Sequence, residues 1–199
     1  KREKFQPSPE EREFLTIEEV RTLMETPCTN EQVKKAFLLS CFVGLRLGDV
    51  RELTWAKVMN TPDGKTQYVH VWMEKTQKPI NVPLSNEALR YMEKKEDPDA
   101  KLFKLPTSDA TINYHIKKWM KAAKIDKKIS YHCSRHTFAT MMLTLGADLF
   151  TTSKLLGHAN VTTTQIYGKI IDKKTEAVNL VDNLFTPKAE LNDEDRTEA

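Results

Sequence analysis

The stretch from 131 to 170 constrains the fold most, because glycines divide it into short helical segments. The first segment shows a helical repeat of apolar residues, and Gly146 is expected to end it. A second helix is expected over about 149–156, ending at Gly157, and Asn160 is placed to cap a third helix. The expected apolar stripe of the first helix consists of Phe138, Met141, Met142 and Leu145.

Four side chains in this stretch can act on a phosphate. His132 and Arg135 are three residues apart at the start of the first helix, so both project from one face. A guanidinium matches a phosphate, and an imidazole transfers protons or donates hydrogen bonds. His158 follows the second helix, and Tyr167 lies near the end of the third, where its hydroxyl could attack phosphorus. Taken singly, each residue also fits an ordinary packing role.

Four motifs follow one another in this stretch: HxxRH, LGADL, LLGH and TTTQIY. Together they resemble the C-terminal signature of the tyrosine recombinases, the phage integrase family. The resemblance implies a catalytic domain that breaks and rejoins DNA strands through a 3′-phosphotyrosyl intermediate, for integration or excision of a mobile element. It implies no metal and no nucleotide cofactor.

An upstream segment, GLRLGD at 44–49, is similar to the first-arginine motif of that family. Arg46 lies in the bend between two expected helices, where its side chain can project into a cleft. The resemblance makes Arg46 a phosphate-binding arginine and Asp49 a residue that orients its neighbours. The alternative is a surface ion pair between them, which would contribute little.

The resemblance also implies how the residues divide the reaction. Arg46 and Arg135 would hold the non-bridging oxygens and offset the charge that grows in the transition state. Tyr167, with a reference pKa of about 10, would attack phosphorus after losing its proton. His132 would accept that proton, and His158 would donate to a phosphate oxygen.

Between the segment at 44–49 and the stretch that starts at 131, the sequence pattern changes to that of strands. The segments at 57–60, 67–73 and 80–84 are rich in β-branched and aromatic residues, and turns separate them. We therefore expect an α+β domain that is mostly helical, with a small antiparallel three-stranded sheet at one edge. A hairpin tip over 74–79 carries Lys75 and Lys78. Such lysines are usually solvated, but the resemblance points to Lys75 as the proton donor to the departing 5′ oxygen, with Lys78 as the fallback.

The charge distribution favours a polyanionic partner. The net charge is +3, but residues 189–199 hold five acids and one base, so the rest has 30 basic and 23 acidic residues. Lysines gather over 117–128, and these, with Lys78, are candidate contacts to a DNA backbone; a solvated helix face is the alternative. The individual candidates in that run are Lys117, Lys118 and Lys121.

We expect three regions in the chain. Residues 1–14 look like a linker, and the resemblance places a DNA-binding domain before it. Residues 15–186 would form the catalytic domain, and the acidic tail 187–199 is expected to be disordered. The amphipathic segment 173–185 would pack either at home or on a neighbouring subunit. The resemblance implies a homotetramer on paired double-stranded DNA sites.

Other classes of protein fit less of the sequence. No apolar run reaches the ~20 residues that a membrane span needs, and three cysteines do not make a disulfide framework, so a cytoplasmic protein is expected. A zinc site from His132, Cys133 and His136 lacks the glutamate of HExxH. A non-catalytic DNA-binding module and a type IB topoisomerase-like enzyme remain alternatives.

Overall fold

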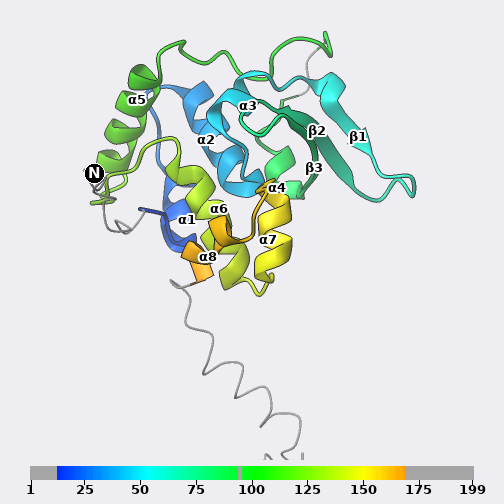
Figure 1. Ribbon diagram of the computed structural model, residues 1–199. Helices are drawn as coiled ribbons and strands as arrows, with labels where there is room; N and C mark the ends of the chain where they lie inside the picture. Colours follow the sequence, from blue (N-terminus) through cyan, green and yellow to red (C-terminus); the bar gives the residue numbers. More distant parts are fainter. Residues whose placement is uncertain (1–12, 94–95, 169–199) are drawn as a thin grey trace, which may run out of the picture.

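The computed structural model describes residues 13–93 and 96–168 (Figure 1). It is mostly helical, with one small sheet on one side of the molecule and α5 on the other. The elements in chain order are α1 (Ile17–Glu25), α2 (Glu31–Val43), α3 (Leu47–Arg51), η1 (Trp55–Lys57), β1 (Val58–Asn60), β2 (Gln67–Met73), β3 (Lys78–Leu84), α4 (Asn86–Leu89), α5 (Asp109–Ala122), α6 (Cys133–Thr144), α7 (Leu149–Leu155) and α8 (Thr162–Gly168).

The sheet is antiparallel in the order β1-β2-β3, which confirms the predicted three strands. Strand β2 alternates strictly, as a half-buried strand should. Its inward side chains Val69, Val71 and Met73 are buried, whereas His70 and Trp72 are exposed. The inner face packs on the helices, so the β2–β3 hairpin has a fixed base from which its tip projects.

The main core is built around α2. The ring of Phe37 meets Trp119 of α5 and Tyr131 edge-on, each at a centroid distance of 5.8 Å. The Tyr131 hydroxyl donates to the carbonyl of Ala36 at 2.8 Å and lies 2.8 Å from Ser40 Oγ. Burial raises the pKa of Tyr131 above its usual value. Tyr131 is therefore a core residue that fixes the start of α6.

Two glycines allow the close approaches around the site. Gly44 ends α2 at φ 69°, and a Cβ there would lie 2.5 Å from the Phe138 ring. Gly157 follows α7 at φ 63°, and a Cβ there would lie 2.5 Å from the sulfur of Met73. Both positions need glycine for space and for backbone conformation. They bring the end of α2 onto α6 and the turn after α7 onto β2.

The expected apolar stripe of the helix after Tyr131 is partly wrong. Phe138 is buried in a second, smaller core between α6, α7 and α8, but Leu145 is 68% exposed. Leu145 lies just beyond the last turn of α6, so it does not share the buried face. The segment 173–185 and the acidic tail lie outside the described residues, as does most of the expected linker. None of the described helices is long and apolar enough to cross a membrane.

Candidate active site

Arg46 stands at the bend between α2 and α3. It is the N-cap residue of α3, and its backbone N–H donates to Asp49 Oδ2 at 3.4 Å. Asp49 is only 5% exposed, so its carboxylate belongs to this bend rather than to the surface. The geometry therefore disfavours a surface ion pair and places the Asp49 carboxylate at the start of α3.

Arg135 projects from the first turn of α6 and is 3% exposed. Its Nη1 donates to the carbonyl of Gly44 at 2.6 Å, and its Nη2 donates to the carbonyl of Leu156 at 2.5 Å. These carbonyls end α2 and α7, where backbone acceptors lack helical partners. One guanidinium thus joins three helices and is held rigidly in place.

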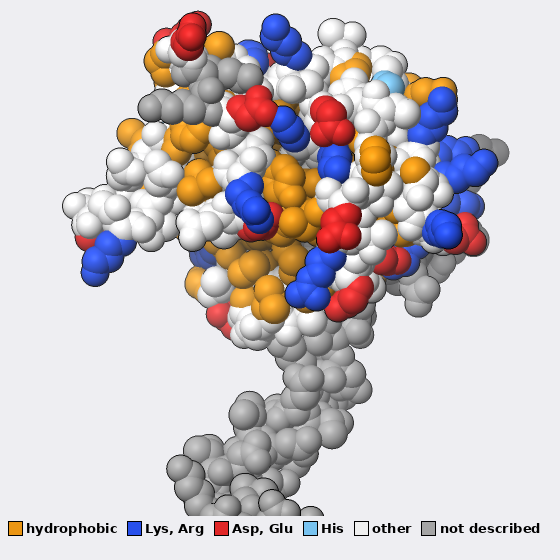
Figure 2. Space-filling view, turned by 180° about the vertical axis from the view of Figure 1, so that it is seen from behind, with side chains coloured by type: hydrophobic (Ala, Val, Ile, Leu, Met, Phe, Trp, Pro, Cys, Tyr) orange, Lys and Arg blue, Asp and Glu red, His pale blue; other side chains and the backbone are white. Residues whose placement is uncertain are grey.

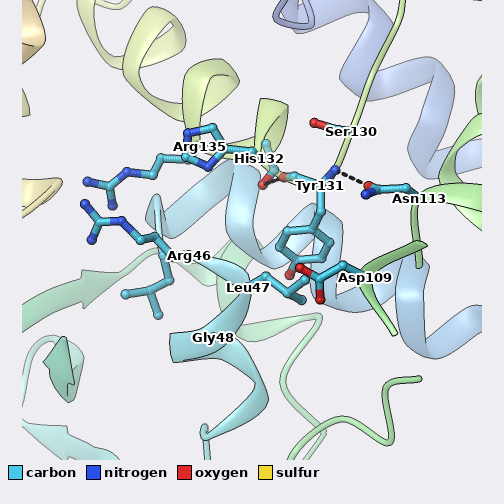
Figure 3. A pocket seen from close by; sticks show the side chains of 11 residues that line it. Arg46, Leu47, Gly48, Asp109, Asn113, Ser130, Tyr131, His132 and Arg135 are labelled. Carbon is cyan, nitrogen blue, oxygen red and sulfur yellow. Dashed lines mark hydrogen bonds between the residues drawn. The ribbon is translucent and has the colours of Figure 1, made fainter. Parts of the chain in front are cut away.

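Arg46, His132 and Arg135 line one pocket of about 270 Å³. Figure 3 shows the two guanidinium groups side by side, with the His132 ring next to Arg135. Ser130, Tyr131, Asn113 and Asp109 line the opposite part, where Asn113 Oδ1 accepts a hydrogen bond of 2.8 Å from the Tyr131 N–H. The fold therefore unites two arginines that are far apart in the sequence.

The positive charge of Arg46 disfavours that of Arg135. The pKa of Arg135 falls to about 10, first because of burial and second because of the positive charge of Arg46. Burial also lowers the pKa of Arg46, against the opposing effects of Asp49 and Tyr167. Arg46 Nη1 is buried, and no residue of the described part accepts a hydrogen bond from it. Such a site is suited to an anion with several oxygens.

Tyr167 lies at the end of α8 and is 3% exposed. Its hydroxyl is 2.5 Å from Nδ1 of His136, which is itself buried. The ring of His132 stands perpendicular to that of His136, with centroids 4.6 Å apart. Tyr167 is not among the described residues that line the pocket of Arg46 and Arg135, hereafter the arginine pocket. Tyr167 thus adjoins the pocket through the two histidines.

His136 is the site residue that the sequence reasoning missed, since it was considered only as a zinc ligand. A signal was present, because His136 comes four residues after His132 and therefore lies on the same face of α6. The described residues contain no group of three or more His, Cys, Asp or Glu side chains that could hold a metal ion.

His158 holds the turn that precedes α8. Its Nδ1 lies 2.8 Å from Oγ1 of Thr164, which is fully buried in α8. This bond ties the turn after α7 to the helix that carries Tyr167. His158 is half-buried, and it is not among the described residues that line the arginine pocket.

Lys75 lies in the tight turn of the β2–β3 hairpin, and Lys78 begins β3; both are exposed. The neighbouring Glu74 packs against α3. A Cβ placed on Gly48, which belongs to α3, would lie 3.3 Å from Oε2 of Glu74. Gly48 lines the arginine pocket. The hairpin tip therefore lies at the α3 side of the pocket. Lys75 is not among the described residues that line this pocket.

The lysines of α5 form an exposed surface. Lys117 comes four residues after Asn113, which lines the pocket, so it continues that side of the helix. Lys118 packs its Nζ over the ring of Tyr114 at 4.7 Å. Lys121 is exposed one turn further on. Figure 2 shows Lys and Arg side chains gathered on the side where α5 lies in that view.

Comparison with known proteins places the chain in a family. The model of the phage integrase family matches residues 13–174. A tyrosine recombinase of Pseudothermotoga lettingae is 29% identical over 175 residues, covering 84% of this chain and 60% of the relative. Tyrosine recombinase XerA of Thermococcus onnurineus is 32% identical over 187 residues, covering 86% and 64%. The chain thus spans less than two thirds of the length of these relatives.

Solved structures agree with this assignment. The crystal structure of XerA recombinase superposes with a TM-score of 0.63 at 25% identity, covering 88% of this chain and 66% of that one. The catalytic domain of bacteriophage HP1 integrase superposes with a TM-score of 0.62 at 23% identity, covering 87% and 97%, and shows the same fold. The chain therefore belongs to the phage integrase family.

Proposed function

We propose that the chain is the catalytic part of a site-specific DNA recombinase that breaks and rejoins strands through Tyr167. The observation that carries the proposal is the pair of guanidinium groups from Arg46 and Arg135, which lie side by side in one pocket, where Arg46 Nη1 is buried without an acceptor among the described residues. A DNA phosphodiester would supply acceptor oxygens and negative charge to both groups. Tyr167, joined to this pocket by His136 and His132, would supply the nucleophile.

In the proposed reaction the arginines hold the two non-bridging oxygens of the scissile phosphate. The Tyr167 oxygen forms a bond to phosphorus while the bond to the 5′ oxygen breaks, which leaves a 3′-phosphotyrosyl link. Lys75, on the hairpin beside α3, gives its proton to the departing 5′ oxygen. His132 and His158 complete the hydrogen bonding around the phosphate. Because the link conserves the ester, a new 5′ hydroxyl can reverse the step on another strand.

Double-stranded DNA is the proposed partner. Several proteins of the same fold were solved with DNA, among them XerH recombinase bound to a difH substrate and the Tn1549 transposon integrase bound to transposon right end DNA. The exposed lysines of α5 and Lys78 would contact the backbone, with strong salt dependence. We place residues 15–186 in the catalytic domain and a DNA-binding domain before the linker 1–14. The protein would assemble as a homotetramer on DNA in the cytoplasm, with residues 173–185 of each subunit docking on a neighbour. The reaction would serve the integration or excision of a mobile element.

A nicked suicide duplex tests the proposal. Cleavage of such a substrate releases a short fragment, so the covalent protein–DNA adduct accumulates and is seen on a denaturing gel. The wild-type chain should form the adduct and Tyr167→Phe should form none while still binding DNA. Tyr114→Phe, which alters an exposed tyrosine of α5, should behave as wild type. An adduct that persists in Tyr167→Phe, or maps to Tyr131, refutes the assignment.

A further inference from the structure

The imidazole of His136 meets the hydroxyl of the proposed nucleophile, Tyr167. Its Nδ1 lies 2.5 Å from the Tyr167 hydroxyl, within a site where the two side chains are 6% and 3% exposed. The two rings are tilted by 45° at a centroid distance of 5.6 Å. Bulk water has little access to this hydroxyl, so a proton leaving Tyr167 needs an acceptor inside the protein.

We propose that His136 is a catalytic residue that holds the Tyr167 hydroxyl and accepts its proton as the phenol oxygen attacks phosphorus. This inference rests on the proposed function and assigns to His136 the step that the sequence reasoning gave to His132. The O–H bond of Tyr167 breaks, an N–H bond forms at His136 Nδ1, and the proton returns when the phosphotyrosyl link is reversed. The leaving 5′ oxygen receives a separate proton, so charge and atoms balance.

The surroundings favour this direction of transfer. Tyr167 acts on both arginines, because its negative form raises the pKa of Arg46 and of Arg135. A phenolate formed at this position is therefore stabilised by two guanidinium groups. His132 stands edge-on to His136 and lines the arginine pocket, so it lies between the proton acceptor and the phosphate.

The other charged or titratable groups of the site come from every element packed around it. They are His132 and Arg135 on α6, Arg46 and Asp49 at α3, His158 after α7 and Tyr167 on α8. The pH dependence of adduct formation must therefore be assigned to one of these groups by substituting it, because the midpoint of the profile alone does not identify the group. Glutamine is the suitable replacement for His136, because its amide can keep a hydrogen bond to the phenol but cannot take up the proton.

The test uses the full chain and single-turnover adduct formation on the suicide duplex across a range of pH. In wild type the rate should rise with pH and level off once the acceptor is deprotonated. His136→Gln should be slower by about 10²–10⁴-fold at neutral pH, and its residual rate should keep rising as the phenol ionises unaided. Thr140→Val is the matched control. It removes a buried hydroxyl one turn further along α6 that has no hydrogen-bond partner in the described part of the chain, so it should retain the wild-type profile.

A more acidic nucleophile separates proton transfer from packing. With 3-fluorotyrosine at position 167, His136→Gln should recover much of its lost rate, whereas the wild-type histidine background should change little. A His136→Gln protein whose rate and pH profile match wild type, or which gains nothing from the acidic phenol, overturns the inference while the proposed function stands. Failure of the wild-type chain to form any adduct overturns both.

A measurement that leaves His136 intact covers the case in which His136→Gln does not fold. The imidazole of His136 is titrated by NMR in wild type and in Tyr167→Phe. A phenol that donates to Nδ1 stabilises the neutral imidazole, so its removal should raise the titration midpoint. A midpoint that falls or stays unchanged would show that His136 does not accept from Tyr167, and would overturn the inference.

Discussion

Replacing Arg46 with methionine should stabilise the free protein while it abolishes most of the activity. The change removes a positive charge and a buried Nη1 that has no acceptor among the described residues, but it keeps an unbranched side chain. The backbone N–H of residue 46 still donates to Asp49, so the start of α3 is preserved. The guanidinium is expected to serve a phosphate rather than the fold.

The expected size of the effect follows from the site. A buried donor without a partner costs about 1–3 kcal/mol, and the half-buried position of Arg46 favours the lower end. The fall of the pKa of Arg135 from 12.5 to about 10 corresponds to roughly 3 kcal/mol. Burial is its larger cause, so the charge of Arg46 accounts for the smaller share. Loss of attraction to Asp49 removes up to about 1 kcal/mol, so we expect a net gain on the order of 1 kcal/mol.

Denaturant unfolding gives the stability, and the suicide duplex gives the rate of adduct formation. Arg46→Met should unfold at higher denaturant than wild type and cleave about 10²–10³-fold more slowly. Added phosphate should stabilise wild type more than the variant, since only wild type has both guanidinium groups.

Arg51→Met is the matched control for this experiment. Arg51 donates to the carbonyls of Pro106 and Thr107 and pairs with Asp109 at 2.9 Å, so its loss should destabilise the fold. If Arg46→Met loses as much stability as Arg51→Met, the guanidinium of Arg46 is structural and the reasoning is refuted.

Two further predictions concern the hairpin and the turn before α8. Lys75→Ala should cleave ordinary DNA slowly, but should recover on DNA whose bridging 5′ oxygen is replaced by sulfur, because a thiolate of reference pKa about 8.5 leaves without a proton; recovery in Lys78→Ala instead would place the donor three residues later. Thr164→Val removes the hydroxyl that meets His158 and should lower the free energy of unfolding by about 1 kcal/mol, whereas Thr164→Ser keeps the hydroxyl and should lose less. Thermal unfolding and adduct rates check the second, and equal effects of Thr164→Val and Thr164→Ser would contradict it.

Local patterns predicted the parts of the fold that depend on neighbouring residues. The β-branched and aromatic residues of 67–73 predicted a strand there, and β2 occupies this segment. Gly44 and Gly157 marked the ends of α2 and α7, because both adopt a positive φ that other residues avoid. These glycines also localised Arg46 and His158 to turns, where side chains can reach a shared site.

The parts that were not predicted depend on contacts between distant segments. The bond between His136 and Tyr167 joins positions 31 residues apart, and no local repeat encodes it. Leu145 fits the helical period of α6, yet its exposure depends on where α7 and α8 cover that helix. Periodicity selects a face of a helix, whereas the neighbouring elements decide how far along the helix that face is buried.

The proposed reaction would link DNA binding to chemistry without requiring the site to recognise bases. Nη1 and Nη2 of Arg135 donate to the carbonyls at the ends of α2 and α7, so we do not expect this side chain to read bases. Any phosphodiester that enters the pocket reduces the repulsion between the two guanidinium groups. The same anion would lie next to His132, whose ring contacts that of His136, and His136 in turn meets the Tyr167 hydroxyl. We therefore expect target choice to come from surfaces outside this pocket, and the α5 lysines to affect affinity more than the rate of the bound complex.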